Sequence, residues 1–120
     1  MLKFILLFAV ALPNTEAVDT VVATTYQLTP KCQGKWGTKV ASGIKLNTKN
    51  PHSNRIIAVS RDLLKKYPFH TKVKITGAGY LSGVYRVEDV MAARWRKKID
   101  ILTNLNQKQN KFHNVKITKI

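Results

Sequence analysis

Acidic side chains are scarce in this chain of 120 residues: it has 6 aspartates and glutamates against 21 lysines and arginines, a formal net charge of +15. A surface of that charge favours polyanionic partners, namely nucleic acid, acidic lipid headgroups or an anionic cell-wall polymer. Because high charge also serves solubility, it supports such a function without selecting one partner.

Cysteine is almost absent, since Cys32 is the only one, and this excludes an intramolecular disulfide. No histidine is paired with Cys32 by a sequence signal, so we interpret it as a packed or incidental thiol. His52, His70 and His113 lack the spacing of metal ligands, and 77–79 is a turn and not a dinucleotide fingerprint. We therefore expect no metal and no cofactor.

No apolar run is long enough to span a bilayer, so we expect no transmembrane segment. The longest run, 4–12, follows Lys3 and precedes Pro13 and the small residue Ala17. This order is typical of a secretory signal peptide, with a buried N-terminal helix as the alternative. We predict a signal peptide from Met1 to Ala17 and export to a periplasm or out of the cell.

Removal of residues 1–17 leaves one domain, 18–120, which we expect to be a monomer. The mature part still carries +15, because one base and one acid are lost together. Export argues against nucleic acid as a partner and favours the cell wall.

The mature part consists of short segments rich in β-branched residues, separated by turn signals. We predict strands at 20–26, 56–59, 72–76, 84–88, 98–102 and 115–120. The only helices expected are a brief one at 60–67, with Ser60 as its N-cap, and an insert of one or two turns at 91–96. Without long helices between strands, the pattern predicts an all-β closed barrel of six to seven strands and not a doubly wound fold.

Three of the five remaining acids lie close together, at Glu88, Asp89 and Asp100. Asp100 stands between Ile99 and Ile101, and strand alternation places it on the face opposite to theirs. An acid in that position either accepts backbone N–H bonds or pairs with a basic side chain as part of the structure, or it transfers protons.

A family resemblance rests on several segments taken in order: 24–26 (Thr-Thr-Tyr), 41–43 (Ala-Ser-Gly), 57–59 (Ile-Ala-Val), 71–75 with Gly77, 83–85 (Gly-Val-Tyr), 88–89 (Glu-Asp) and 99–100 (Ile-Asp). This order resembles the 3D domain, a family named for three aspartates. It is similar to the catalytic domain of membrane-bound lytic transglycosylase A and, more remotely, to rare lipoprotein A. The resemblance extends from about residue 20 to residue 120 and implies a double-psi-like β-barrel with short helical inserts.

The resemblance places the second family aspartate at Asp89 and the third at Asp100. The first falls on Ser60; Asp62 lies two residues on, but helix phase points it elsewhere. The Thr-Gly-Gly that follows the second family aspartate is replaced here by 90–92 (Val-Met-Ala).

The implied activity is cleavage of peptidoglycan glycan strands without water. A carboxyl protonates the glycosidic oxygen and then takes the proton of the sugar's own 6-hydroxyl, which closes an anhydro ring. Such a group must be protonated near neutral pH, which needs burial or a neighbouring acid. By resemblance, Asp100 is the acid/base and Asp89 tunes its pKa. The alternatives are a wall-binding module that lost turnover together with the first aspartate, and an exported polyanion-binding effector.

Aromatic side chains are candidate platforms for sugar rings. Trp95 lies on the insert beside the acids, and Tyr26 and Trp36 are further candidates. For Tyr26, packing in the barrel is an equally good interpretation.

Polar candidates complete the expected site. Ser42 matches a family motif and offers a hydrogen bond, and Arg94 and Arg96 are placed to hold carboxylates of the wall, although a solvated face explains these arginines as well. Glu88 alternates with Asp89, so we expect Glu88 at the surface, beside a lysine.

Overall fold

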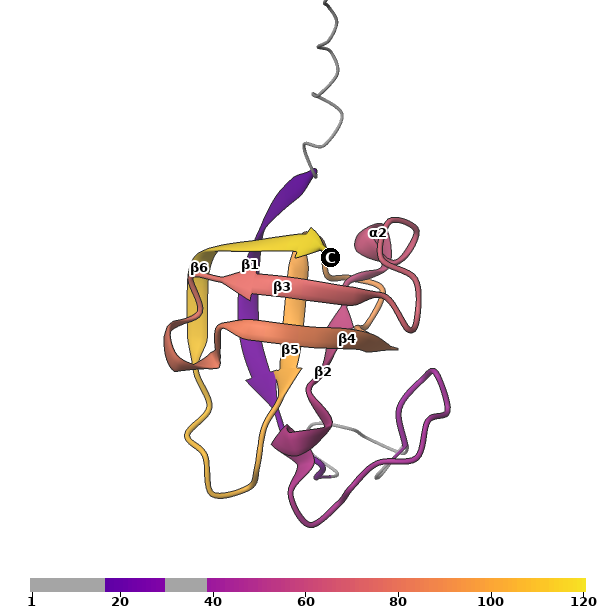
Figure 1. Cartoon of the computed structure of the whole chain (residues 1–120), viewed down its shortest axis with the longest axis vertical. Helices are drawn as coiled ribbons and strands as arrows, with labels where there is room; N and C mark the ends of the chain where they lie inside the picture. Colours follow the sequence, from indigo (N-terminus) through magenta and orange to yellow (C-terminus); the bar gives the residue numbers. More distant parts are fainter. Residues whose placement is uncertain (1–16, 30–38) are drawn as a thin grey trace, which may run out of the picture.

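The computed structural model describes residues 17–29 and 39–120. Six strands close a barrel in the order β1-β5-β2-β4-β3-β6 (Figure 1). Their bounds are β1 Val18–Tyr26, β2 Ile56–Val59, β3 Lys72–Thr76, β4 Gly83–Val90, β5 Lys98–Leu102 and β6 Lys111–Lys119. The predicted all-β closed barrel of six to seven strands is confirmed, with six strands.

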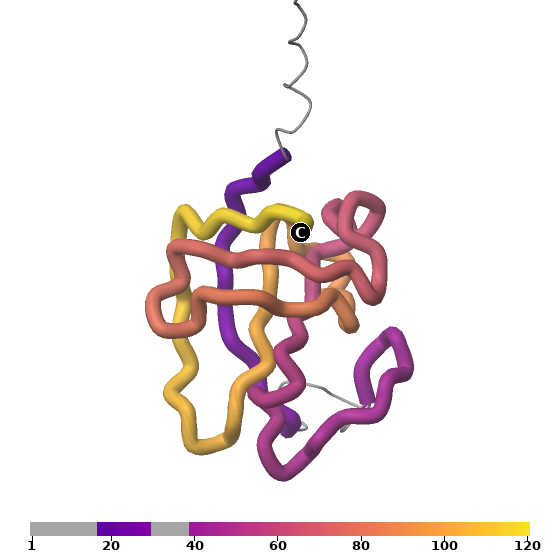
Figure 2. The backbone as a smooth tube through the Cα atoms, viewed as in Figure 1, coloured from indigo at the N-terminus to yellow at the C-terminus, as the bar shows by residue number. Residues whose placement is uncertain are grey.

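The barrel is mixed and interleaved. The β1–β5 and β2–β4 pairs are parallel, and the other four pairs are antiparallel. Only β3 and β4 are neighbours both in sequence and in the barrel. Figure 2 shows β1 beside β5, where Thr24 pairs with Asp100, 76 residues away. This arrangement is consistent with a double-psi barrel.

Alternate residues of all six strands fill the barrel interior, as the period-two pattern requires. Each strand contributes two side chains to this core, and Leu63, Tyr67, Ala78 and Leu81 close it from outside the strands. On β5, Ile99 and Ile101 are fully buried here, so Asp100 points to the opposite face, as predicted.

A second apolar cluster covers the outer face of β1, β2 and β5. Its buried members are Tyr26, Val40, Ile56, Ala58, Met91 and Leu102, and Leu28, Ile44, Leu46 and Trp95 pack against it. The segment that follows residue 38 therefore lies against the outside of the barrel and supplies an apolar setting for polar groups on that face.

The helical elements are short: α2 spans Arg61–Leu64, η3 spans Pro51–Asn54 and η4 spans Gly79–Leu81. Ser60 is the N-cap of α2, as predicted, but its hydroxyl makes no cap bond. None of the helices in the described ranges has the length and apolarity to cross a membrane.

The predicted helical insert at 91–96 is wrong. The structure has a turn there, with the Trp95 N–H donating to the Ala92 carbonyl at 3.1 Å. The Met91 N–H is bonded to the Val59 carbonyl at 2.9 Å, which continues the β2–β4 pairing, and Met91 packs in the second cluster. Met91 therefore belongs to the strand pairing, and 92–97 form a turn that leads into β5. Residues 1–16 of the predicted signal peptide, Cys32 and Trp36 lie outside the described residues.

Candidate active site

The two site aspartates lie in one row across four strands. Thr24 on β1 pairs with Asp100 on β5, Asp100 pairs with Ala58 on β2, and Ala58 pairs with Asp89 on β4. Neighbouring strands are about 4.8 Å apart, so the two aspartate backbones are separated by about 10 Å. Because Ala58 carries only a methyl group, the space between the two carboxylates is not filled from the strand that divides them.

Asp100 has few partners for an acid in this position. Thr24 Oγ1 donates to its Oδ1 at 3.0 Å. Within the described residues Asp100 accepts no backbone N–H and forms no ion pair, and its Oδ2 accepts no hydrogen bond. The residue is half-buried. The described contacts therefore do not support the interpretation of Asp100 as a structural acid.

Burial raises the pKa of Asp100 from 3.8 to about 6. The Thr24 hydrogen bond and the charge of Lys98 oppose this rise, and the charge of Asp89 adds to it. A carboxyl with this pKa changes between its protonated and ionised forms close to neutral pH, as a group that both gives and takes a proton must.

Asp89 is enclosed and fully bonded. It is 9% exposed; its Oδ1 accepts the N–H groups of Ala41 and Val90, each at 3.0 Å, and its Oδ2 accepts the Tyr26 hydroxyl at 3.1 Å. Burial raises its pKa, although the three hydrogen bonds oppose the rise. With both oxygens occupied, Asp89 is a fixed neighbour of the more open Asp100. The Tyr26 ring itself is buried in the second cluster.

Glu88 corrects one prediction, because it is fully buried and not at the surface. Ile57 pairs with Val87 but Ala58 pairs with Asp89, so Glu88 is the extra residue of a β-bulge. The bulge breaks the alternation that had placed Glu88 and Asp89 on opposite faces.

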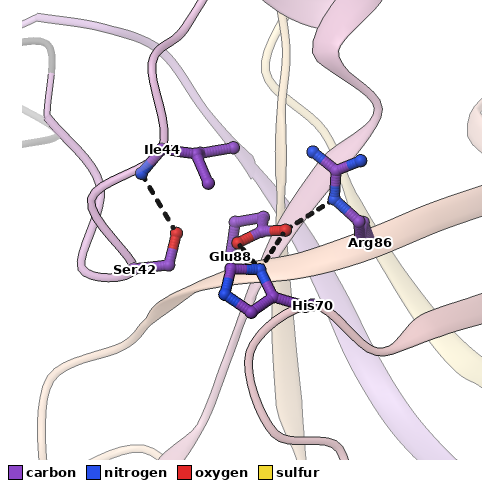
Figure 3. A network of polar contacts seen from close by, with 5 residues as sticks. All are labelled: Ser42, Ile44, His70, Arg86 and Glu88. Atoms are coloured by element: carbon purple, nitrogen blue, oxygen red, sulfur yellow. Dashed lines mark hydrogen bonds and ion pairs between the residues drawn. The ribbon is translucent and has the colours of Figure 1, made fainter.

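The buried Glu88 carboxylate lies at the centre of a polar network (Figure 3). Arg86 Nε donates to its Oε2, and His70 Nδ1 lies 3.1 Å from Oε2 and 3.0 Å from Oε1. Burial acts to raise the pKa of Glu88, but hydrogen bonds from Ser42, His70 and Arg86 outweigh it and hold the pKa below the ordinary 4.5. His70 adopts a left-handed backbone, with φ of 79°.

Ser42 anchors a turn over β4. The Ser42 N–H donates to the Glu88 carbonyl at 3.0 Å, and its neighbour Ala41 supplies one of the N–H groups on Asp89. Ser42 therefore contacts Glu88 and not Asp100, and the turn at 41–43 ties the Glu88 network to the row of aspartates.

Trp95 is flanked by cations. The Lys98 ammonium lies 3.6 Å from the centre of its ring, and the Arg94 guanidinium lies 4.8 Å from it. Arg96 donates through Nη1 to the carbonyls of Ala93 and Trp95 at 2.7 and 2.9 Å. The sequence interpretation missed Lys98, although its position two residues before Asp100 on a strand was a signal that both share a face.

Ser60 stands where the resemblance places the first aspartate, so that position carries no acid. Ser60 is fully buried, and its Oγ accepts the Lys98 N–H at 3.0 Å. Asp62 is exposed and accepts the Lys97 N–H at 3.0 Å, so it holds the turn before β5 and does not join the row. Helix phase predicted that Asp62 points away from the site, and its position agrees with this.

The fold and site together define a closed mixed β-barrel with two carboxylates on one outer face, one open and one enclosed. Within residues 17–29 and 39–120, no group of three histidine, cysteine or acidic side chains is placed to hold a metal ion. Comparison with models of known families and with curated proteins finds no match to this chain.

Proposed function

We propose that this protein is exported and cleaves the glycan strands of peptidoglycan in the manner of a lytic transglycosylase, with Asp100 as the acid/base. The observation that carries the proposal is the state of Asp100: burial raises its pKa to about 6, and its Oδ2 is free of hydrogen bonds from the described residues. The resemblance to the 3D domain and the net charge of +15 also support it.

One carboxyl carries both proton transfers in this reaction. Protonated Asp100 gives its proton to the glycosidic oxygen after an N-acetylmuramic unit, and the bond from that oxygen to C1 breaks. The ionised carboxylate then takes the proton of the same sugar's 6-hydroxyl, whose oxygen bonds to C1. No water is consumed, and Asp100 ends in the protonated form in which it began.

Two residues around Asp100 support its proton transfer. Thr24 fixes one carboxylate oxygen by its hydrogen bond, so the other is directed to the substrate. Asp89 raises the proton affinity of Asp100 through its charge. Since the nucleophile belongs to the substrate, the second carboxylate of an ordinary glycosidase is not required.

A second candidate function is a binding module that holds glycan strands without turnover. Ser60 favours it, because this buried residue bonds the backbone of β5 where the resembling family has its first aspartate. If that aspartate is essential for the chemistry, binding remains and cleavage is lost.

Mass spectrometry of purified sacculi incubated with the mature protein separates the two functions. We expect anhydro-muropeptides from the wild type and from Asp62→Asn, a matched change at an exposed aspartate, and none from Asp100→Asn. Sedimentation with sacculi but no soluble product from any variant identifies the binding module. Failure to bind sacculi refutes both functions.

A further inference from the structure

Lys98 lies beside the proposed acid and has no task in the proton transfer. It precedes Asp100 by two residues on β5, so both side chains leave the same face, with backbones about 7 Å apart. The fully buried Ile99 between them points into the barrel. Lys98 is itself partly buried, which is a costly environment for an ammonium group.

The Lys98 ammonium has no anionic partner in the described part of the chain. The ion pairs there are Lys66–Asp19, His70–Glu88 and Arg86–Glu88. Lys98 is held instead by the Trp95 ring, 3.6 Å from the ring centre, and its charge acts on Asp100 without a direct ion pair. A cation fixed on an aromatic face, whose ammonium makes no hydrogen bond to the described residues, is ready to receive an anion.

The two arginines expected to hold carboxylates are less suited to this task. Arg96 already donates to two backbone carbonyls, and Arg94 is exposed and lies farther from the Trp95 ring than Lys98 does. The indole face under the Lys98 ammonium is occupied, so on that side Trp95 positions Lys98 and does not stack on a sugar.

We propose that Lys98 binds the carboxylate of an acidic sugar seated at Asp100 and so selects muramic-type units over neutral N-acetylglucosamine. This rests on the proposed function and specifies its substrate. Lys98 and Asp100 leave the same face of β5 with backbones about 7 Å apart, so a sugar whose anomeric bond meets Asp100 brings a short acidic arm on the same ring toward Lys98. The carboxylate is either that of the sugar's lactyl arm or that of a peptide attached to it.

Binding is tested by NMR titration of the mature protein, followed at the Trp95 indole N–H and at backbone amides of β5. Three ligands are compared: N-acetylmuramic acid, with a free lactyl carboxylate; N-acetylglucosamine, the same ring without that arm; and a muramyl peptide, in which the lactyl carboxyl is an amide and the carboxylate lies on the peptide. A charge-assisted hydrogen bond gives a preference of about tenfold over N-acetylglucosamine. The acidic ligand that shows it identifies the source of the carboxylate.

Three variants decide the role of Lys98. We expect Lys98→Gln to reduce the preference to within about twofold, Lys98→Arg to keep most of it, and Lys97→Gln, which removes the same charge from an exposed neighbour, to leave it unchanged. The NMR spectra show at once whether each variant is folded.

The proposal is overturned by equal binding of acidic and neutral ligands to the wild type, or by an equal loss of preference in Lys97→Gln. The readout is independent of turnover. If the wild type prefers acidic ligands but releases no anhydro-muropeptides, the role of Lys98 is supported and only the enzymatic function is refuted. If the wild type cleaves glycan strands but does not prefer acidic ligands, only the role of Lys98 is refuted.

Discussion

Replacing Asp100 with asparagine is expected to make the protein more stable at neutral pH while removing its proposed chemistry. The folded protein raises the pKa of Asp100 from 3.8 to about 6, so ionising this group in the barrel costs more than in the unfolded chain. The stability associated with a raised carboxyl pKa is fully present below 3.8 and is lost as pH rises through 6. Asparagine has the same shape, keeps an acceptor for Thr24 and carries no charge.

Each unit by which the pKa is raised corresponds to about 1.36 kcal/mol. The expected gain in the free energy of unfolding of Asp100→Asn is therefore about 3 kcal/mol at pH 8 and only about 0.5 kcal/mol at pH 4. For a domain of this size the larger value raises the melting temperature by on the order of 10 °C. Urea unfolding of wild type and Asp100→Asn across this pH range measures the difference. Equal stability at pH 8, or a gain that is the same at pH 4 and pH 8, refutes the idea that Asp100 is held in an environment that resists its ionisation.

Two further substitutions test the groups around the aspartates. Glu88→Gln is expected to behave in the opposite sense. Hydrogen bonds from Ser42, His70 and Arg86 outweigh burial and lower the pKa of Glu88, so their stabilisation is present above pH 4.5 and is lost as pH falls. The variant is less stable by about 2 kcal/mol at pH 7, with a smaller deficit at pH 3, and a deficit that does not shrink contradicts this. Ser60→Ala leaves the Lys98 N–H without its acceptor and costs about 1–3 kcal/mol in urea unfolding; no loss of stability counts against the Ser60 hydrogen bond as a support of β5.

The sequence predicted β5 well because its signal is local. Ile99 and Ile101 alternate with Asp100, and period-two alternation needs no knowledge of the partner strands. Glu88 was misplaced for the opposite reason. A bulge is a property of two paired strands, and the skip from Ile57 to Ala58 opposite Val87 and Asp89 becomes visible only when β2 lies beside β4.

The surroundings of the site depended on contacts between distant segments. The turn at 41–43 reaches Asp89 across 48 residues of sequence, and no periodicity links the two. Lys98 was overlooked for a local reason: its partner, the Trp95 ring, is three residues away, but the segment that carries Trp95 was expected to be helical. Composition and alternation therefore predicted the barrel, while the partners of Asp89 and Asp100 followed from tertiary pairing.

The interleaved strand order determines when the barrel can form. β1 is the first strand to leave the ribosome, but its partners β5 and β6 are the last two strands, so β1 has no strand partner until residues 98–102 have been synthesised and is paired on both sides only after about residue 119. Of the adjacent pairs, β3–β4 and β2–β4 become available first, once residue 90 has been made, and only β3–β4 is a hairpin. Contacts this distant in sequence make folding slow, and they keep a nascent chain open until its last two strands have been made. A chain that folds this late stays unfolded, and so able to pass through a narrow channel, for longer than a chain whose neighbouring strands pair as they emerge.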